Sequence, residues 1–169
     1  MRRVPLALVL VTLAACARNP TVTVGAVAVS DPLPQVSGRT LDGAEITPDD
    51  YRGKIMLVNL WATWCYACTR EMPTIQRLYE RFGPQGVYFL GVDERDNHAA
   101  ATDFVDRLGV TYPSIEDPSA SWADDFGWFA LPDTYLVDRS GVIRYAITGY
   151  RINEEQVARL LEKMLKAPG

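Results

Sequence analysis

Two cysteines stand three positions apart, where a predicted strand is followed by a predicted helix. The run Ile55–Trp61 is apolar and rich in branched side chains, which indicates a buried strand. Apolar residues then recur at helical spacing, at Ile75, Leu78, Tyr79 and Phe82. Cys65 is therefore expected at the very start of a helix, and Cys68 one turn further in.

That position has consequences for the chemistry of the two thiols. A helix N-terminus presents unpaired N–H groups and a partial positive charge, which stabilise a nearby anion. Cys65 should therefore ionise easily, with a pKa in the range of roughly 3.5–7.5 known for such sites, and act as a nucleophile. Cys68, one turn below and more buried, is placed to attack the mixed disulfide that forms on Cys65.

Two other interpretations of the pair are less favourable. A zinc site normally needs four ligands, and beyond the pair the chain offers only Cys16 and His98. A static disulfide that closes so short a loop gains little chain entropy. A C-x-x-C pair within a strand–helix–strand pattern instead favours redox chemistry, and we predict that Cys65 and Cys68 form a redox-active disulfide with no metal and no cofactor.

The N-terminus has the pattern of an export signal. Met1-Arg2-Arg3 is basic, residues 4–13 are apolar, and Leu13-Ala14-Ala15-Cys16 ends the run with small residues. The run is too short for a stable transmembrane span. Its ending resembles the bacterial lipobox, in which the cysteine is acylated and becomes the mature N-terminus. An ordinary signal cleaved near Ala15 or Ala17, or a free thiol at Cys16, are the alternatives.

The domain plan follows from composition and length. The chain has 169 residues, 48% of them hydrophobic and 22% charged, which fits one globular domain with a short extension. We predict a lipoprotein-type signal peptide over residues 1–15, a membrane tether over 16–31 and a folded domain over 32–169. The alternative for the tether is a strand that pairs with the domain. The net charge of −4 gives no reason to expect a nucleic-acid partner.

Cysteine usage is consistent with this plan. If Cys16 carries lipid, the remaining two cysteines pair with each other and the odd count of three is explained. In an oxidising compartment, a chain with a single dithiol is more easily explained by catalysis than by structure.

The other predicted elements form an alternating α/β pattern. Residues 35–50 suggest a small β-hairpin, and Val87–Asp93 a second buried strand, parallel to the first. The loop 93–97 should lie on the dithiol's side of the sheet. We interpret it as solvated, and contact with substrate is the alternative. Residues 99–108 fit a helix closed by Gly109, and Asn153 with Gln156 predicts a capping box for a last helix. The aromatic segment 121–129 fits either a short helix packed on the core or an apolar rim beside the dithiol.

The residues around the cysteines resemble a known family. Asn59-Leu60-Trp61-Ala62-Thr63-Trp64-Cys65-x-x-Cys68 is similar to the active-site signature of thioredoxin-like proteins, and more closely to the extracytoplasmic TlpA/ResA/DsbE (CcmG) branch that serves cytochrome c maturation. The resemblance extends from about Pro34 to the C-terminus. It implies a thioredoxin fold: an α/β structure with a mixed central sheet flanked by helices and an added N-terminal β-hairpin.

The resemblance also implies roles for residues outside the pair. Residues 130–138 resemble the family's cis-proline loop, in which Pro132 faces the dithiol and the backbone of Leu131 pairs with bound substrate. A trans proline at a strand start is the alternative. Predicted substrate contacts are Trp64, Tyr66, Ala67, Leu131 and Asp133.

Departures from ordinary thioredoxins narrow the comparison. Asn59 stands where thioredoxins carry a buried aspartate. Glu71, one turn beyond Cys68 on the same helix face, matches the acid of the cytochrome-maturation branch, and a solvated surface glutamate is its alternative. Asp133 follows the proline where thioredoxins usually have threonine, and an acid there resembles the DsbE-type subgroup. Tyr66-Ala67 between the cysteines tunes the redox poise.

The expected function is that of a membrane-tethered, extracytoplasmic thiol–disulfide oxidoreductase that acts as a monomer. The family implies reduction of apocytochrome c or other disulfide-bearing polypeptides, with electrons from a membrane thiol reductase. An oxidase or isomerase of secreted proteins is the first alternative. A peptide-binding or copper-handling module is a second one, although copper would want another soft ligand near the cysteines. A peroxidase is disfavoured, since nothing else marks a peroxidatic cysteine.

Overall fold

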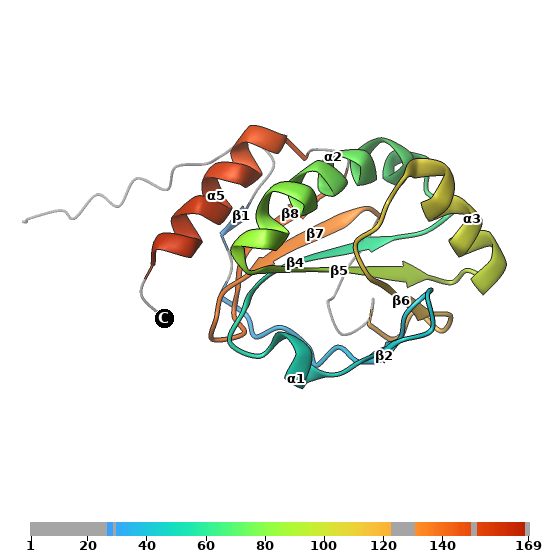
Figure 1. The fold of residues 1–169 in the computed structure, drawn as a ribbon, viewed down its shortest axis with the longest axis horizontal. Coiled ribbons are helices and arrows are strands. Elements are labelled where there is room, and N and C mark those ends of the chain that lie inside the picture. Colours follow the sequence, from blue (N-terminus) through green and yellow to red (C-terminus); the bar gives the residue numbers. More distant parts are fainter. Residues whose placement is uncertain (1–26, 29, 123–130, 150–151, 168–169) are drawn as a thin grey trace, which may run out of the picture.

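A mixed β-sheet runs through the centre of the molecule (Figure 1). The structure is a computed structural model that describes residues 27–28, 30–122, 131–149 and 152–167, and within these ranges six strands form the sheet in the order β1-β8-β7-β4-β5-β6. β4 pairs in parallel with β5 and antiparallel with β7, and β5 pairs in parallel with β6. The strands span Val27–Ala28 (β1), Ile55–Trp61 (β4), Val87–Glu94 (β5), Ser114–Asp117 (β6), Asp133–Val137 (β7) and Ile143–Thr148 (β8).

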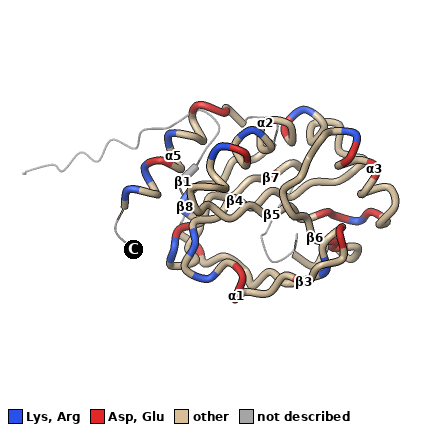
Figure 2. The backbone as a smooth tube through the Cα atoms, in the orientation of Figure 1, with Lys and Arg blue, Asp and Glu red and all other residues tan. Residues whose placement is uncertain are grey.

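The central strand β4 is buried on both faces. Alternate side chains point to opposite sides of a strand, so Ile55, Leu57 and Trp61 join one hydrophobic cluster and Met56, Val58 and Leu60 the other. All six are at most 2% exposed. Charged residues lie mainly on the helices and loops, whereas β4 carries none (Figure 2). A strand covered on both sides reads as a continuous apolar run, and this explains the predicted buried strand.

Three helices contribute to the cluster on one side of the sheet: α2 (Tyr66–Phe82), α3 (His98–Leu108) and α5 (Glu154–Lys166). Their inward faces include Met72, Phe104 and Leu161, each at most 2% exposed. Asparagine side chains cap two of them: the oxygen of Asn97 accepts from the amide of Ala100, and that of Asn153 from the amide of Gln156. The predicted helix over 99–108 and its stop at Gly109, which has φ of +65°, are confirmed.

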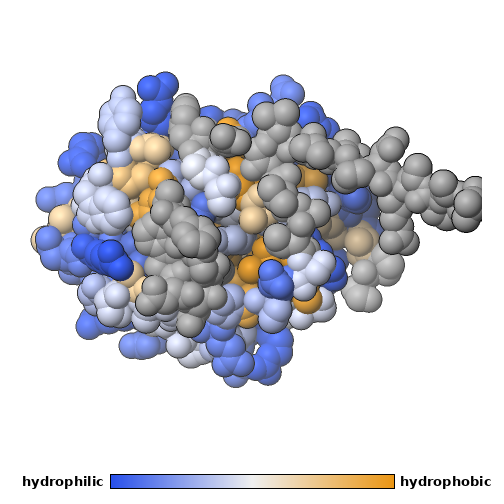
Figure 3. Space-filling view, turned by 180° about the vertical axis from the view of Figure 1, so that it is seen from behind, coloured by the Kyte–Doolittle hydropathy of each residue, from blue (hydrophilic) through white to orange (hydrophobic). Residues whose placement is uncertain are grey.

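The other side of the sheet is covered by the predicted N-terminal hairpin. β2 (Gly38–Arg39) pairs antiparallel with β3 (Glu45–Ile46), and the short helix α1 (Pro48–Tyr51) follows. The Tyr51 hydroxyl donates to the Val36 carbonyl at 2.9 Å and fixes the hairpin's entry. A 3₁₀ turn, η1 (Gly83–Gln85), joins α2 to β5. Seen from behind, hydrophilic residues surround the rim of the molecule and hydrophobic ones are visible toward its middle (Figure 3).

The N-terminal boundary of the sheet differs from the prediction. Val27–Ala28 lie within the segment 16–31, yet they form β1 and pair with β8, so the sheet takes in chain that precedes residue 32. The signal segment and most of the aromatic segment 121–129 lie outside the described residues. No helix in the described ranges combines the length and the hydropathy that crossing a bilayer requires.

Candidate active site

The two cysteines form a disulfide at the junction of β4 and α2. Their sulfur atoms are bonded and their Cα atoms lie 5.3 Å apart. Cys65 is the N-cap of α2, and its Sγ accepts a hydrogen bond from the amide of Cys68 at 3.1 Å. Cys65 is 6% exposed and Cys68 is fully buried, as predicted. A thiolate on Cys65 would be stabilised by this amide and by the helix N-terminus.

Two large aromatic side chains flank the more accessible cysteine. Trp64 is 57% exposed and Tyr66 is 75% exposed, whereas Ala67 is half-buried and packs against the core. Large apolar side chains are usually buried, so exposure on both sides of Cys65 is informative. This surface can receive a polypeptide with apolar side chains around its own sulfur.

The bond between Leu131 and Pro132 is cis, as the cis-proline resemblance implied. Asp133 is paired with Leu60 near the end of β4. Pro132 therefore lies one residue further on, at the same end of the sheet as the loop that carries Cys65. Pro132 is buried and Leu131 is half-buried. The Pro132 carbonyl accepts from the amide of Gly149 at 2.8 Å, which ties this loop to the end of β8.

Glu71 is fully buried, and the interpretation of it as a surface residue is wrong. The Thr134 hydroxyl donates to its Oε1 at 2.7 Å, and the Asn59 amide group donates to the same oxygen at 3.4 Å. Asn59 also donates to Thr134 at 3.1 Å and accepts from the Tyr112 hydroxyl at 3.2 Å. These four side chains form a polar network under α2, beside the dithiol.

Burial decides how the acids near the dithiol titrate. It raises the pKa of Glu71 to about 7; the Thr134 hydrogen bond opposes the rise and the nearby charge of Asp133 adds to it. Burial likewise raises the pKa of Asp133 to about 6, against hydrogen bonds from Tyr135 and Gly149. One oxygen of each carboxyl, Glu71 Oε2 and Asp133 Oδ1, has no hydrogen-bond partner among the described residues. Both groups can therefore take up or release a proton near neutral pH.

The sequence suggested that the loop after β5 is solvated, but part of it is buried. β5 extends to Glu94, and Asp93 is only 2% exposed. Asp96 accepts from the backbone amide of Thr63 at 2.5 Å and from the Thr63 hydroxyl at 2.6 Å. Thr63 lies two residues before Cys65, so this loop is bonded to the active-site turn.

Several participants had no sequence signal of their own. Thr134 and Tyr112 each look like ordinary core-facing residues, and Asp93 looks like the end of a strand followed by a loop. The sequence signal for a buried polar network was Asn59, a polar residue within an otherwise apolar run. His98 is mostly exposed, and its Nδ1 lies 3.0 Å from a carboxylate oxygen of Glu116. The described residues contain no group of three or more side chains that could hold a metal ion.

The fold, the dithiol at a helix N-terminus and the cis-proline just before β7 define a thioredoxin-like thiol–disulfide exchange protein. Residues 29–146 match the AhpC/TSA family, and the chain belongs to this family. It is 35% identical over 139 residues to the thiol-disulfide oxidoreductase ResA of Geobacillus thermodenitrificans, covering 82% of this chain and 79% of that one. It is 38% identical over 127 residues to the thiol:disulfide interchange protein DsbE of Pseudomonas aeruginosa, covering 73% and 68%.

A solved structure shows the same fold. A secreted thiol-disulfide isomerase from Corynebacterium glutamicum superposes with a TM-score of 0.75 at 24% identity, covering 88% of this chain and 95% of that one. Together with the Cys65–Cys68 disulfide, these relatives identify the chain as a thiol–disulfide oxidoreductase of the ResA/DsbE type.

Proposed function

We propose that this chain is a membrane-tethered, extracytoplasmic reductase that keeps the haem-binding cysteines of apocytochrome c reduced. The observation that supports it most directly is Glu71, fully buried one helical turn beyond Cys68. The resemblance to the cytochrome-maturation branch includes an acid at this position. The similarity to ResA and to DsbE also supports the proposal.

The reaction balances in two exchange steps. The Cys65 thiolate attacks one sulfur of a substrate disulfide, forms a mixed disulfide and releases the first substrate thiolate, which takes a proton from solvent. Cys68 then loses its proton and attacks Cys65 Sγ, which releases the second substrate thiolate. Two electrons pass to the substrate, and Cys65–Cys68 becomes the disulfide seen here. A membrane thiol reductase would return the two electrons.

Glu71 has a defined part in the second step. A buried thiol ionises reluctantly, because charge is costly in a low dielectric. A carboxylate one turn away can accept the proton of Cys68 directly or through water. A pKa of about 7 lets Glu71 accept that proton at neutral pH and release it afterwards. The two groups should titrate as a coupled pair.

A trapping experiment tests the substrate. Cys68→Ser leaves the mixed disulfide on Cys65 unresolved, so we expect the variant to accumulate covalent complexes with c-type cytochromes, while Cys65→Ser/Cys68→Ser traps none. The reduction potential should lie well below the roughly −120 mV of a strong bacterial oxidase. If the trapped proteins are instead secreted proteins with many disulfides and the potential is high, the oxidase or isomerase alternative replaces this proposal.

The anchor is a separate proposal that rests on Leu13-Ala14-Ala15-Cys16. Cys16 would carry the lipid and residues after it would lead to the domain. One acyl chain alone binds membranes only marginally, so stable anchoring requires more than one. Cys16→Ser should release the protein from membranes and leave the rate of disulfide exchange by the purified protein unchanged. Equal membrane retention of the variant would refute the anchor without touching the redox proposal.

A further inference from the structure

A second set of carboxyl groups lies at the end of β5 and in the loop that follows it, next to the active-site turn. Asp93 is the seventh residue of β5 and pairs with Trp61, the last residue of β4. Asp96 follows in the loop and accepts two hydrogen bonds from Thr63, through both of its oxygens. Neither acid takes part in the exchange steps described above.

The turn that Asp96 holds is the one that presents the reactive cysteine. The amide of Cys65 donates to the carbonyl of Ala62 at 3.2 Å, which closes a tight turn over residues 62–65. Within that turn Thr63 is bonded to Asp96, and the next residue is Trp64, 57% exposed. A charged acceptor that takes both an N–H and an O–H fixes a loop more firmly than a neutral one does.

We propose that Asp96, supported by Asp93, is a positioning residue that fixes the Thr63–Trp64 turn for polypeptide substrates and places one negative charge close to Cys65. Among the described residues, Asp96 makes hydrogen bonds to Thr63 and none to either sulfur, so its effect is exerted through Thr63. This role concerns thiol–disulfide exchange by Cys65 and Cys68 and does not depend on which polypeptide is the natural substrate.

The charges around Asp93 all favour its neutral form. The pKa of Asp93 is raised to about 9, and burial is the largest cause. The hydrogen bond with Asp96 and the negative charges of Asp96, Glu116 and Glu94 raise it further. Glu116 belongs to β6 and is bonded to His98 at the start of α3. A neutral Asp93 can donate to Asp96, so at pH 7 the pair carries one negative charge rather than two.

The sign of the effect on the dithiol follows from that charge. Cys65 is two residues from Thr63, which places it within about 10 Å of the Asp96 carboxylate. A negative charge at such a distance disfavours the Cys65 thiolate and so disfavours the reduced form. Neutralising it should shift the redox equilibrium toward the dithiol by about two- to tenfold.

The experiment compares variants that separate charge from hydrogen bonding. Asp96→Asn removes the charge and, because an amide nitrogen cannot accept, one of the two hydrogen bonds from Thr63. Thr63→Val removes the hydroxyl hydrogen bond but keeps the charge and the shape, and Thr63→Ser restores the hydroxyl. Asp49→Asn is the charge control, since Asp49 is 81% exposed on α1. Redox equilibria with glutathione and the rates of reducing insulin and 5,5′-dithiobis(2-nitrobenzoate) are measured at pH 7. Insulin serves as the polypeptide disulfide and the aromatic compound as a small one.

The expected pattern differs from that of general damage to the fold. Asp96→Asn should shift the glutathione equilibrium toward the dithiol by about two- to tenfold, and Asp49→Asn should not. Thr63→Val should slow insulin reduction by about two- to tenfold, with the small disulfide and the equilibrium unaffected, and Thr63→Ser should behave as the wild type. Asp96→Asn matching Asp49→Asn in the equilibrium, or Thr63→Val slowing both disulfides equally, would overturn the proposal.

A titration of the oxidised protein tests the role of Asp93 without interference from thiols. The amide resonance of Thr63 should move with a midpoint near pH 9 in the wild type and should not move in Asp93→Asn, whose side-chain amide can still donate to Asp96. Asp93→Asn should keep the wild-type glutathione equilibrium at pH 7. A Thr63 resonance that stays constant between pH 7 and 10.5 in the wild type would overturn the support from Asp93.

Discussion

Carboxyl groups in the turns of this protein behave oppositely to those in its interior. In the turns, the pKa of Asp42 is lowered first by the side chain of Thr40, and that of Asp50 by the backbone of Thr47 at the start of α1. At Asp138, partial burial acts to raise the pKa, but hydrogen bonds from Ser140, Arg144 and Val142 lower it overall. Each of these acids is stabilised in its charged form by the local chain.

In the interior, burial is the largest influence on Glu71, Asp93 and Asp133, and it raises all three pKa values. Ionising these acids costs free energy that their hydrogen bonds and neighbouring charges do not offset. The turn acids are therefore explained by stability, whereas the interior acids point to chemistry.

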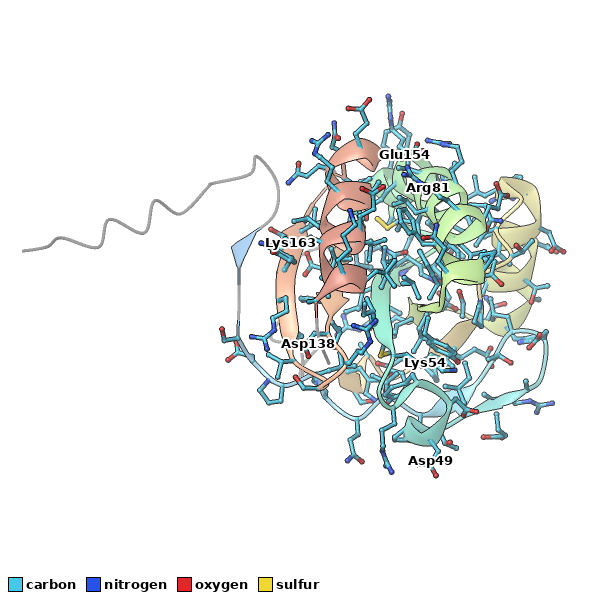
Figure 4. The ribbon with its side chains drawn as sticks, turned by 60° about the vertical axis from the view of Figure 1, so that its left-hand side comes forward. Asp49, Lys54, Arg81, Asp138, Glu154 and Lys163 are labelled. Carbon is cyan, nitrogen blue, oxygen red and sulfur yellow. A yellow bond between two sulfur atoms is a disulfide. The ribbon has the colours of Figure 1, made fainter. Side chains whose placement is uncertain are left out.

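Two of the turn acids, Asp50 near Lys54 and Asp138, are also separated in space from the interior acids. Lys54 and Asp138 stand just before β4 and just after β7, at the end of the sheet opposite the dithiol (Figure 4). β4 has seven residues, and at about 3.3 Å per residue it separates that end from the Cys65 turn by roughly 20 Å. Substitutions of Asp50 or Asp138 can therefore be scored without directly disturbing the interior acids.

The largest effect is expected for Glu71→Gln. The substitution keeps the shape and the acceptor for Thr134 but removes the base, so resolution of the mixed disulfide by Cys68 should slow by about 10²-fold at pH 8. In the wild type the rate should rise with a midpoint near pH 7, because only ionised Glu71 accepts the proton. Stopped-flow thiol exchange across pH 5–9 measures both quantities.

Glu80→Gln is the matched control, since Glu80 is exposed on the same helix. Its rates and pH profile should equal those of the wild type. A wild-type profile in Glu71→Gln would remove the difference between interior and turn acids.

The fold could be predicted from the sequence because its signals are local and repeated. The apolar run of β4, the helical spacing after Cys68 and the stop at Gly109 each follow from the requirements of one element. The dithiol and Glu71 were predicted in the same way, since i, i+3 spacing on one helix fixes their common face.

The rest of the site could not be predicted, because it depends on long-range contacts. Thr134 is 63 residues from Glu71 and Asp96 is 33 residues from Thr63, yet each pair is hydrogen-bonded. Only the pairing of β4 with both β5 and β7 brings them together. The interpretation of the 93–97 loop as solvated was wrong for Asp93, because a carboxylate at a strand end gives no sign of being covered by neighbouring strands.

The same Glu71→Gln variant should be more stable than the wild type at pH 8. The pKa of Glu71 is about 7 in the folded chain against an ordinary 4.5, so the unfolded chain releases this proton first. The contribution of Glu71 to stability is therefore lost as pH rises through about 7. Urea unfolding of the oxidised protein should show a gain of about 1–3 kcal/mol for the variant at pH 8, and little at pH 4. Equal stabilities at both pH values would contradict the cost assigned to the interior acid.

Asp138→Ala should have the opposite character. The carboxylate accepts from the amides of Ser140 and Val142 and from the Arg144 guanidinium. Its loss should lower the free energy of unfolding by about 1–2 kcal/mol at pH 7, with the exchange rate unchanged. Because the pKa of Asp138 is lowered in the fold, this stability is lost as pH falls through that pKa, and the variant should approach the wild type in acid. A slower exchange rate would show that the two ends of the sheet are coupled.

The smallest effect is expected for Asp133→Asn, which tests whether the interior acids act as one set. Asp133 is buried beside the cis-proline, and its charge contributes to the raised pKa of Glu71. Without that charge, the midpoint of the resolution rate should move slightly below pH 7, and the plateau should stay within about threefold of the wild type.

The change at Asp133 should instead appear in substrate choice. Asp133 is buried directly after Pro132, in the loop expected to pair with substrate, so we expect KM for a polypeptide disulfide to change severalfold while KM for a small disulfide stays constant. Asp49→Asn, exposed on α1, controls for the lost charge. A fall in the plateau rate as large as that of Glu71→Gln would make Asp133 a second proton acceptor, because only a group that handles the Cys68 proton limits resolution at saturating substrate.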